Sequence, residues 1–229
     1  YVRILHIARR AKFCCVKMAC EAFVVALSII AFILSATAAF SCQFVAHIGH
    51  LPNANVDYWV GAGFVGHAKL GSSIRNDYWC HSWQSSEKDA LWDSEWKAGM
   101  AFAIIAFALG FIAMVMSIFF CCGDNGKKKT WGCLGGFYVF ITLCQGLSLI
   151  ALNSEVVNSY TYVVNDYLNI AKLSIGPGAG SAIAAIVLWF LCAVFSCYSA
   201  KTASDEEESE ATRDNAEPLL GSNADGEAA

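Results

Sequence analysis

Four long stretches of the chain are built from apolar and small residues and contain no charged residue and no histidine. They cover residues 22–40, 98–122, 131–152 and 181–200. Each is close to the roughly 20 residues that a helix needs to cross the core of a bilayer. The pattern therefore predicts an all-α membrane protein with a four-transmembrane-helix bundle as its core.

The polar positions fall between and around these spans, and they divide the chain into three parts. Residues 1–20 mix basic and apolar side chains, which predicts a basic cytoplasmic amphipathic segment on the membrane surface, or a basic flank that only sets topology. Residues 21–200 form the transmembrane domain, with outer loops at 41–97 and 153–180 and an inner turn at 123–130. Residues 201–229 are rich in acidic residues and poor in aromatic ones, which predicts a disordered tail.

Basic residues lie before the first span and between the second and third spans, and their positions predict the orientation of the chain in the membrane. Residues 1–20 carry five arginines and lysines without an acid, and Lys127–Lys129 follow the second span. Since basic residues mark the cytoplasmic side, both termini are expected in the cytoplasm of a multi-pass protein of the secretory pathway or plasma membrane. One alternative stays open, in which the first span is a signal peptide cleaved near Ala36-Thr37-Ala38.

The outer loops contain signs of local structure. The stretch 56–67 alternates aromatic and β-branched residues with three glycines, which predicts one or two short strands with bends. Ser86 is a predicted cap for a helix that leads into the second span. Apolar residues recur at three- and four-residue steps over 156–168, which predicts an amphipathic helix that continues the third span. Glycine and Pro177 then break the chain before the fourth span.

Two of the eleven cysteines, Cys42 and Cys80, are the only ones on the predicted outer side. A pair in an oxidising compartment is expected to form a disulfide. The bridge makes the large loop a small disulfide-closed, partly β extracellular domain.

Seven other cysteines lie near the predicted inner membrane face. Cys14, Cys15, Cys121 and Cys122 are candidate S-palmitoylation sites, and the alternative is that they are small apolar residues at the lipid boundary. The second interpretation is favoured for Cys20, Cys133 and Cys197. Cys144 and Cys192 lie within spans, where they are expected to fill apolar space.

The spans offer few groups for ion binding or catalysis. Transporters and proton relays usually place acids, bases or histidine within the membrane. Here the most polar such residue is Gln145, which is expected to form a hydrogen bond between helices. In the large loop His47 and His50 have a spacing that suits a metal on a helix, but solvated histidines are the favoured interpretation.

No sequence motif of a known enzyme class fits the chain. The run Gly61-x-Gly63-x-x-Gly66 has the spelling of a dinucleotide-binding motif without its strand–turn–helix context. We therefore expect no enzyme, no cofactor, no bound metal and no nucleic-acid partner. The expected partners are the lipid bilayer and other membrane proteins, or copies of the chain itself.

The layout resembles the claudin and peripheral-myelin-protein superfamily of tetraspan proteins over about residues 13–200. The shared features are a cytoplasmic N-terminus, a large first outer loop with two cysteines and aromatic residues, a long third helix, and cysteines at the inner helix ends. The family motif in that loop is W…G-L-W…C…C. In this chain Tyr58-Trp59-Val60-Gly61 and Gly63-Phe64-Val65 occupy the loop, Cys42 precedes them and Cys80 follows them.

The resemblance and the layout together predict a non-enzymatic membrane organiser that works by adhesion or scaffolding through its outer loops. Aromatic residues of the large loop are the candidate contact residues: Tyr58, Trp59, Phe64, Trp79 and Trp83. The alternative is an auxiliary subunit that modulates a channel or transporter. A further alternative is a pore or small-solute transporter formed by oligomers.

Overall fold

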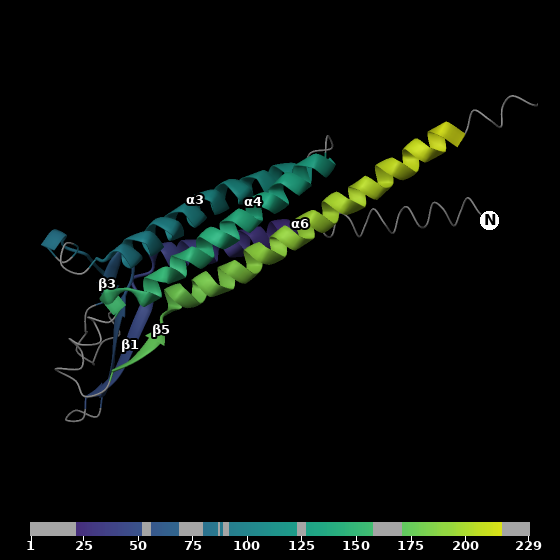
Figure 1. Cartoon of the computed structure of the whole chain (residues 1–229). Coiled ribbons are helices and arrows are strands. Elements are labelled where there is room, and N and C mark those ends of the chain that lie inside the picture. Colours follow the sequence, from purple (N-terminus) through teal and green to yellow (C-terminus); the bar gives the residue numbers. More distant parts are fainter. Residues whose placement is uncertain are drawn as a thin grey trace, which may run out of the picture.

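The computed structural model describes residues 22–51, 56–68, 80–86, 88, 92–122, 127–157 and 171–216. It has four helices that are long and apolar enough to cross a membrane, at Ala22–Phe40, Ser94–Cys121, Trp131–Asn153 and Pro177–Thr202. These helices lie side by side as a bundle, and a small β-sheet sits at one end of it (Figure 1). The predicted segment 1–20 lies outside the described residues.

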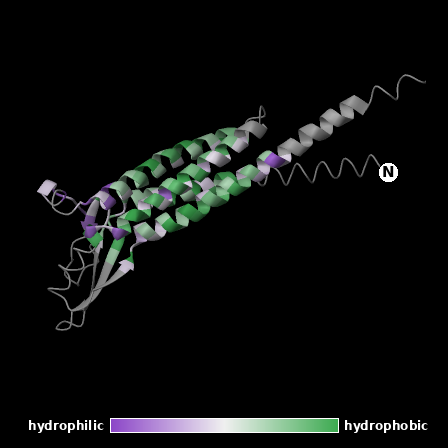
Figure 2. Cartoon of the chain, in the orientation of Figure 1, coloured by the Kyte–Doolittle hydropathy of each residue, from purple (hydrophilic) through white to green (hydrophobic). Residues whose placement is uncertain are grey.

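The apolar spans agree with the four predicted stretches to within a few residues at each end. Along the bundle the hydrophobic colour is nearly continuous, and hydrophilic residues appear towards its two ends (Figure 2). Helix α3 (Ser94–Cys122) begins four residues before the uncharged run, and helix α4 spans Lys127–Leu147. The length and composition of the four helices therefore confirm the prediction of a multi-pass membrane protein.

The tail differs from the prediction of disorder over 201–229. Helix α6 runs from Pro177 through Ala216, so the backbone of residues 201–216 is helical, and it extends past the ends of α3 and α4 (Figure 1). Glutamate has a high helix propensity, and a helix that is already nucleated in the span adds further turns at little cost. Residues 217–229 lie outside the described part of the chain.

In each of the four helices, a series of buried positions recurs at alternating steps of three and four residues. In α4 they are mostly large: Trp131, Leu134, Tyr138, Ile141 and Gln145. In the other three helices they are mostly small: Val24, Ser28, Ala31, Ser35 and Ala38; Gly99, Ala103, Ala106, Gly110, Ala113 and Ser117; Ala182, Ala185, Trp189, Cys192, Ser196 and Ser199. An average step of 3.5 residues is the repeat of left-handed helix packing. The side chains of α4 therefore fill space that three small-residue helices leave open.

Polar contacts in this interior join helices that are distant in sequence. Ser28 Oγ lies 3.2 Å from Ser117 Oγ, and Trp189 Nε1 donates to Ser35 Oγ at 3.0 Å. The Tyr138 ring stacks on Trp189 with centroids 5.5 Å apart. Among the residues that the structure describes, Gln145 has no hydrogen bond to another transmembrane helix, in contrast to the prediction. Its Nε2 donates instead to Ser148 Oγ, three residues along, at 3.5 Å.

The sheet has five antiparallel strands in the order β4-β3-β2-β1-β5. Strands β1 (Val45–Leu51) and β2 (Val56–Ala62) form a hairpin, with Val45 opposite Ala62 and Leu51 opposite Val56. Strands β3 (Gly66–Ala68) and β4 (Cys80–Ser82) continue the sheet on one side. The strands predicted over 56–67 are thus confirmed, whereas β1 was not predicted.

The fifth strand, β5 (Ala171–Ile175), comes from the second loop and pairs with β1, with Val45 opposite Ile175. The two loops therefore share one sheet, which the sequence pattern did not predict. Helix α4 also does not continue beyond the span as a regular α-helix. It passes into a 3₁₀ helix, η1 (Ser148–Asn153), and the chain turns to an extended conformation at Ser154. Most of the amphipathic segment predicted over 156–168 lies outside the described residues.

Candidate functional site

The segment directly after the first span, residues 41–44, forms hydrogen bonds with the start of helix α6. The backbone N–H of Gly178 donates to the Gln43 carbonyl at 3.0 Å, and those of Gly176 and Ala179 donate to the Phe44 carbonyl. The first N–H groups of a helix have no partner within the helix, so carbonyls placed here satisfy them. Pro177, the first residue of α6, suits this position because it has no N–H to satisfy. The end of the first span and the start of the fourth are therefore joined by backbone hydrogen bonds.

Asp93 connects the starts of two other segments. Its Oδ1 accepts the backbone N–H of Trp96 at 2.8 Å, and its Oδ2 accepts the backbone N–H of Glu155. The first contact is an N-cap of α3, and the second reaches a residue 62 positions away. The predicted cap, Ser86, is thus not the one that starts α3. Asp93 directly precedes Ser94 and Glu95 in the sequence. This acidic start just before the uncharged run was the signal that could have identified Asp93 as the cap.

The predicted disulfide between Cys42 and Cys80 is present, with the two Cα atoms 5.9 Å apart. Cys42 lies two residues beyond the first span, and Cys80 lies in β4, at the edge of the sheet. The bridge therefore fixes the edge strand farthest from β5 to the end of the first span.

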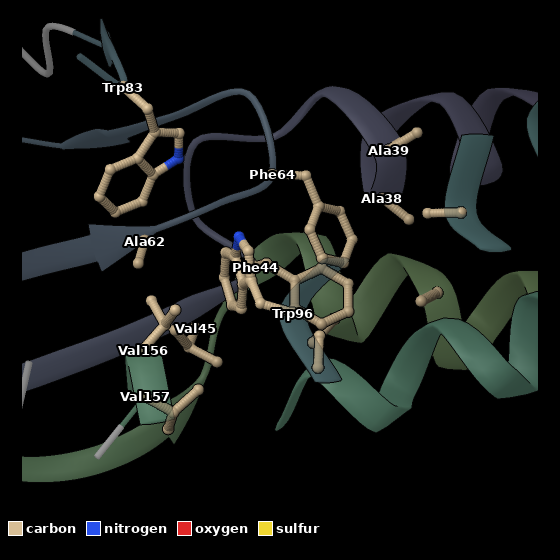
Figure 3. Packing of buried hydrophobic residues seen from close by; sticks show 14 residues of the cluster. Ala38, Ala39, Phe44, Val45, Ala62, Phe64, Trp83, Trp96, Val156 and Val157 are labelled. Atoms are coloured by element: carbon tan, nitrogen blue, oxygen red, sulfur yellow. The ribbon is translucent and has the colours of Figure 1, made fainter. Parts of the chain in front are cut away.

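Aromatic side chains fill the space between the sheet and the helices (Figure 3). Phe44 and Phe64 have ring centroids 4.4 Å apart, and Phe64 and Trp96 have centroids 5.2 Å apart. All three belong to one buried cluster with residues from the first span, from α6 and from the segment after η1. Trp96 is fully buried in this cluster.

The turn between β2 and β3 packs directly on the end of the first span. A Cβ atom on Gly63 would overlap the Ser41 carbonyl oxygen and the Cys42 backbone, so only glycine fits there. The Gly63 carbonyl in turn accepts a hydrogen bond from Trp83 Nε1 at 2.9 Å. The glycines of the rejected dinucleotide motif therefore serve close backbone packing.

The five predicted contact residues fall into three groups. Phe64 is 2% exposed and Trp83 is 5% exposed, so both are core residues, and neither side chain is available to a partner on the surface. An apolar ring gains more by covering the helix ends than by facing solvent. Tyr58 and Trp59 lie in β2, where the structure describes the backbone only, and Trp79 lies outside the described residues.

The cysteines within the helices divide by exposure. Cys144 and Cys192 are buried, as expected, whereas Cys133 and Cys197 are exposed. Of the four predicted lipidation sites, Cys121 is partly exposed at the end of α3, and Cys122 is described in its backbone only. Cys14 and Cys15 lie outside the described residues.

The histidines of the large loop do not have the helical spacing considered for a metal. The backbone at His47 and His50 is part of strand β1, so a three-residue step does not place them on one helix face. Within the described ranges, no three residues among histidine, cysteine, aspartate and glutamate gather to hold a metal ion. The described geometry at the sheet end is that of a rigid junction between a sheet and a helix bundle.

No protein-family model matches this chain, and no curated protein is similar to it. The resemblance to the claudin and peripheral-myelin-protein superfamily therefore stays a prediction.

Proposed function

We propose that this protein is a non-enzymatic membrane organiser, whose sheet domain stands outside the membrane and contacts neighbouring proteins or other copies of the chain. The single observation that carries the proposal is the way the sheet is fixed to the bundle. Independent contacts hold it there: the disulfide, the Asp93 bridge, the backbone bonds to Gln43 and Phe44, and the aromatic cluster. A surface held this firmly loses little conformational entropy when it binds, which favours recognition.

The outward position of the sheet follows from the charges at the other end of the bundle. Lys127–Lys129 begin α4 there, and Lys201 lies at the end of the last span. Basic residues beside spans favour the cytoplasmic side, so the sheet end faces the exterior or the lumen.

Two single substitutions test this orientation through glycosylation. Tyr78→Thr creates an acceptor site at Asn76 in the large loop, and Asp225→Thr creates a matched site at Asn223 in the tail. The proposal predicts a glycan on Asn76 only, seen as a gel shift that an endoglycosidase removes. A glycan on Asn223 instead would show that the orientation is reversed.

Adhesion and scaffolding are tested in cells that do not aggregate on their own. Expression of the full chain is expected to cause cell aggregation or ordered clusters of the protein in the membrane. Removal of aromatic side chains by Trp59→Ala with Trp79→Ala is expected to abolish this effect. His81→Ala, at an exposed position of β4, is the matched control. Surface biotinylation ensures that the variants are compared at equal surface levels.

Purification in mild detergent separates the alternatives. Self-assembly supports the proposal. A stoichiometric channel or transporter partner would replace the proposal with the role of an auxiliary subunit. Conductance of the purified protein in liposomes would replace it with an oligomeric pore.

A further inference from the structure

Two cysteines at the end of the bundle away from the sheet are exposed, although they lie within the apolar spans. Cys133 in α4 and Cys197 in α6 are both exposed. Of the other three span cysteines that the structure describes in full, Cys144 and Cys192 are buried at 4% and 0% exposure, and Cys121 at the end of α3 is partly exposed. The bundle thus separates packed cysteines from cysteines at the surface that would meet lipid.

The two exposed thiols lie at nearly the same depth. A Cβ atom on Gly135 would be 2.8 Å from Cys197 Sγ, so Cys197 is level with Gly135, two residues from Cys133. Each cysteine is four residues from a lysine, Lys129 in α4 and Lys201 in α6. Four residues correspond to about 6 Å along a helix. Both thiols therefore lie just inside the boundary between the apolar region and the headgroups.

The surface of α4 beside Cys133 is open. Gly136, three residues further into the span and on the same side of the helix, is exposed, and a Cβ atom there would meet nothing within 4 Å. Phe140, one turn deeper, is 53% exposed. A hydrocarbon chain attached to Cys133 would run over Gly136 towards the bilayer centre without displacing a side chain.

From these positions we infer that Cys133 and Cys197 are S-acylated by long-chain acyl groups. The thiol sulfur attacks the carbonyl carbon of a long-chain acyl-CoA thioester. A new thioester bond forms, the bond to coenzyme A breaks, and the thiol proton leaves with the coenzyme A thiol. The inference rests on the orientation proposed above, since acyl-CoA is a cytoplasmic reagent. It differs from the sequence-based prediction, which named Cys14, Cys15, Cys121 and Cys122 as candidates and favoured an apolar filling role for Cys133 and Cys197.

Mass tagging of the full chain in a eukaryotic host tests this inference. Free thiols in membranes are blocked with N-ethylmaleimide, thioesters are cleaved with neutral hydroxylamine, and each released thiol is tagged with a polyethylene-glycol maleimide. The expected result is the loss of one tag in Cys133→Ser, one in Cys197→Ser, and two in the double variant. The buried-site variant Cys144→Ser is the matched control and keeps every tag.

The same cells carry Tyr78→Thr as an orientation reporter. If Asn76 is glycosylated and the double variant keeps as many tags as the parent protein, the acylation inference is wrong and the orientation stands. If Asn76 stays unmodified and no tag is lost, both proposals are overturned. Because both cysteines are exposed, Cys133→Ala and Cys197→Ala serve as second variants that confirm correct folding by their elution from a sizing column.

Discussion

Gly99 of α3 is the position where one added methyl group gives the sharpest test of the helix packing. A Cβ atom there would lie 2.6 Å from the Ala151 Cβ and 2.8 Å from the Ser148 carbonyl oxygen. Carbon atoms pack best at about 3.5–4.0 Å, so Gly99→Ala forces α3 and η1 apart by about 1 Å. Overpacking of this kind costs about 1–3 kcal/mol.

Gly136→Ala is the matched control, because it adds the same atom where nothing lies within 4 Å. Alanine is about 1 kcal/mol more favourable than glycine in a helix interior, so this variant is expected to be neutral or slightly more stable. Both substitutions gain the same helix propensity, so the difference in stability between the two variants reports the overpacking at Gly99.

The assay is equilibrium unfolding of the purified protein in mixed micelles, by titration with a denaturing detergent and tryptophan fluorescence. The double variant Gly99→Ala with Ala151→Gly removes the nearest clashing atom and is expected to recover part of the lost stability. Equal stability of Gly99→Ala and Gly136→Ala, or a lower stability of Gly136→Ala, would refute the contact between α3 and η1.

Three further substitutions test the junction at the sheet end. Cys42→Ser opens a disulfide between residues 38 positions apart, which costs about 4 kcal/mol of stability in the loop-entropy account. Surface biotinylation should show less of the variant at the cell surface. Equal surface levels, together with a gel mobility of the parent protein that does not change on reduction, would argue against the bridge. Asp93→Ala removes two hydrogen bonds, so we expect a loss of about 2 kcal/mol in stability and faster hydrogen exchange at the Trp96 and Glu155 amides, whereas Asp93→Asn should lose about half as much stability. Equal exchange in the parent protein and both variants would contradict the double contact. Trp83→Phe keeps a six-membered aromatic ring but removes the five-membered ring and its N–H, so the hydrogen bond to Gly63 and some buried packing are lost. A loss of at least about 1 kcal/mol is expected in the same unfolding titration, and no loss would contradict that bond.

Much of the bundle was predictable because the relevant signal is local. An uncharged run of about 20 residues has few structural options in a bilayer, and the four spans accordingly lie where the pattern places them. The disulfide was predictable because only two cysteines fall on one side of the predicted topology. The strands over 56–67 follow from their own alternation.

The missed features depend on contacts between distant segments. Strand β5 forms because Ala171–Ile175 meets β1 more than 120 residues earlier in the chain, and its five residues carry no decisive pattern. Asp93 becomes a bridge only when Glu155 is brought to it. Phe64 and Trp83 resemble surface aromatics in the sequence, and only the closing of the sheet over the helix ends buries them.

The central claim is that lipid surrounds these four helices, and alkaline carbonate extraction of the full chain from native membranes tests it most directly. The account predicts that the chain stays in the vesicle pellet with integral membrane markers. Recovery of the intact chain in the supernatant, free of vesicles, would contradict it.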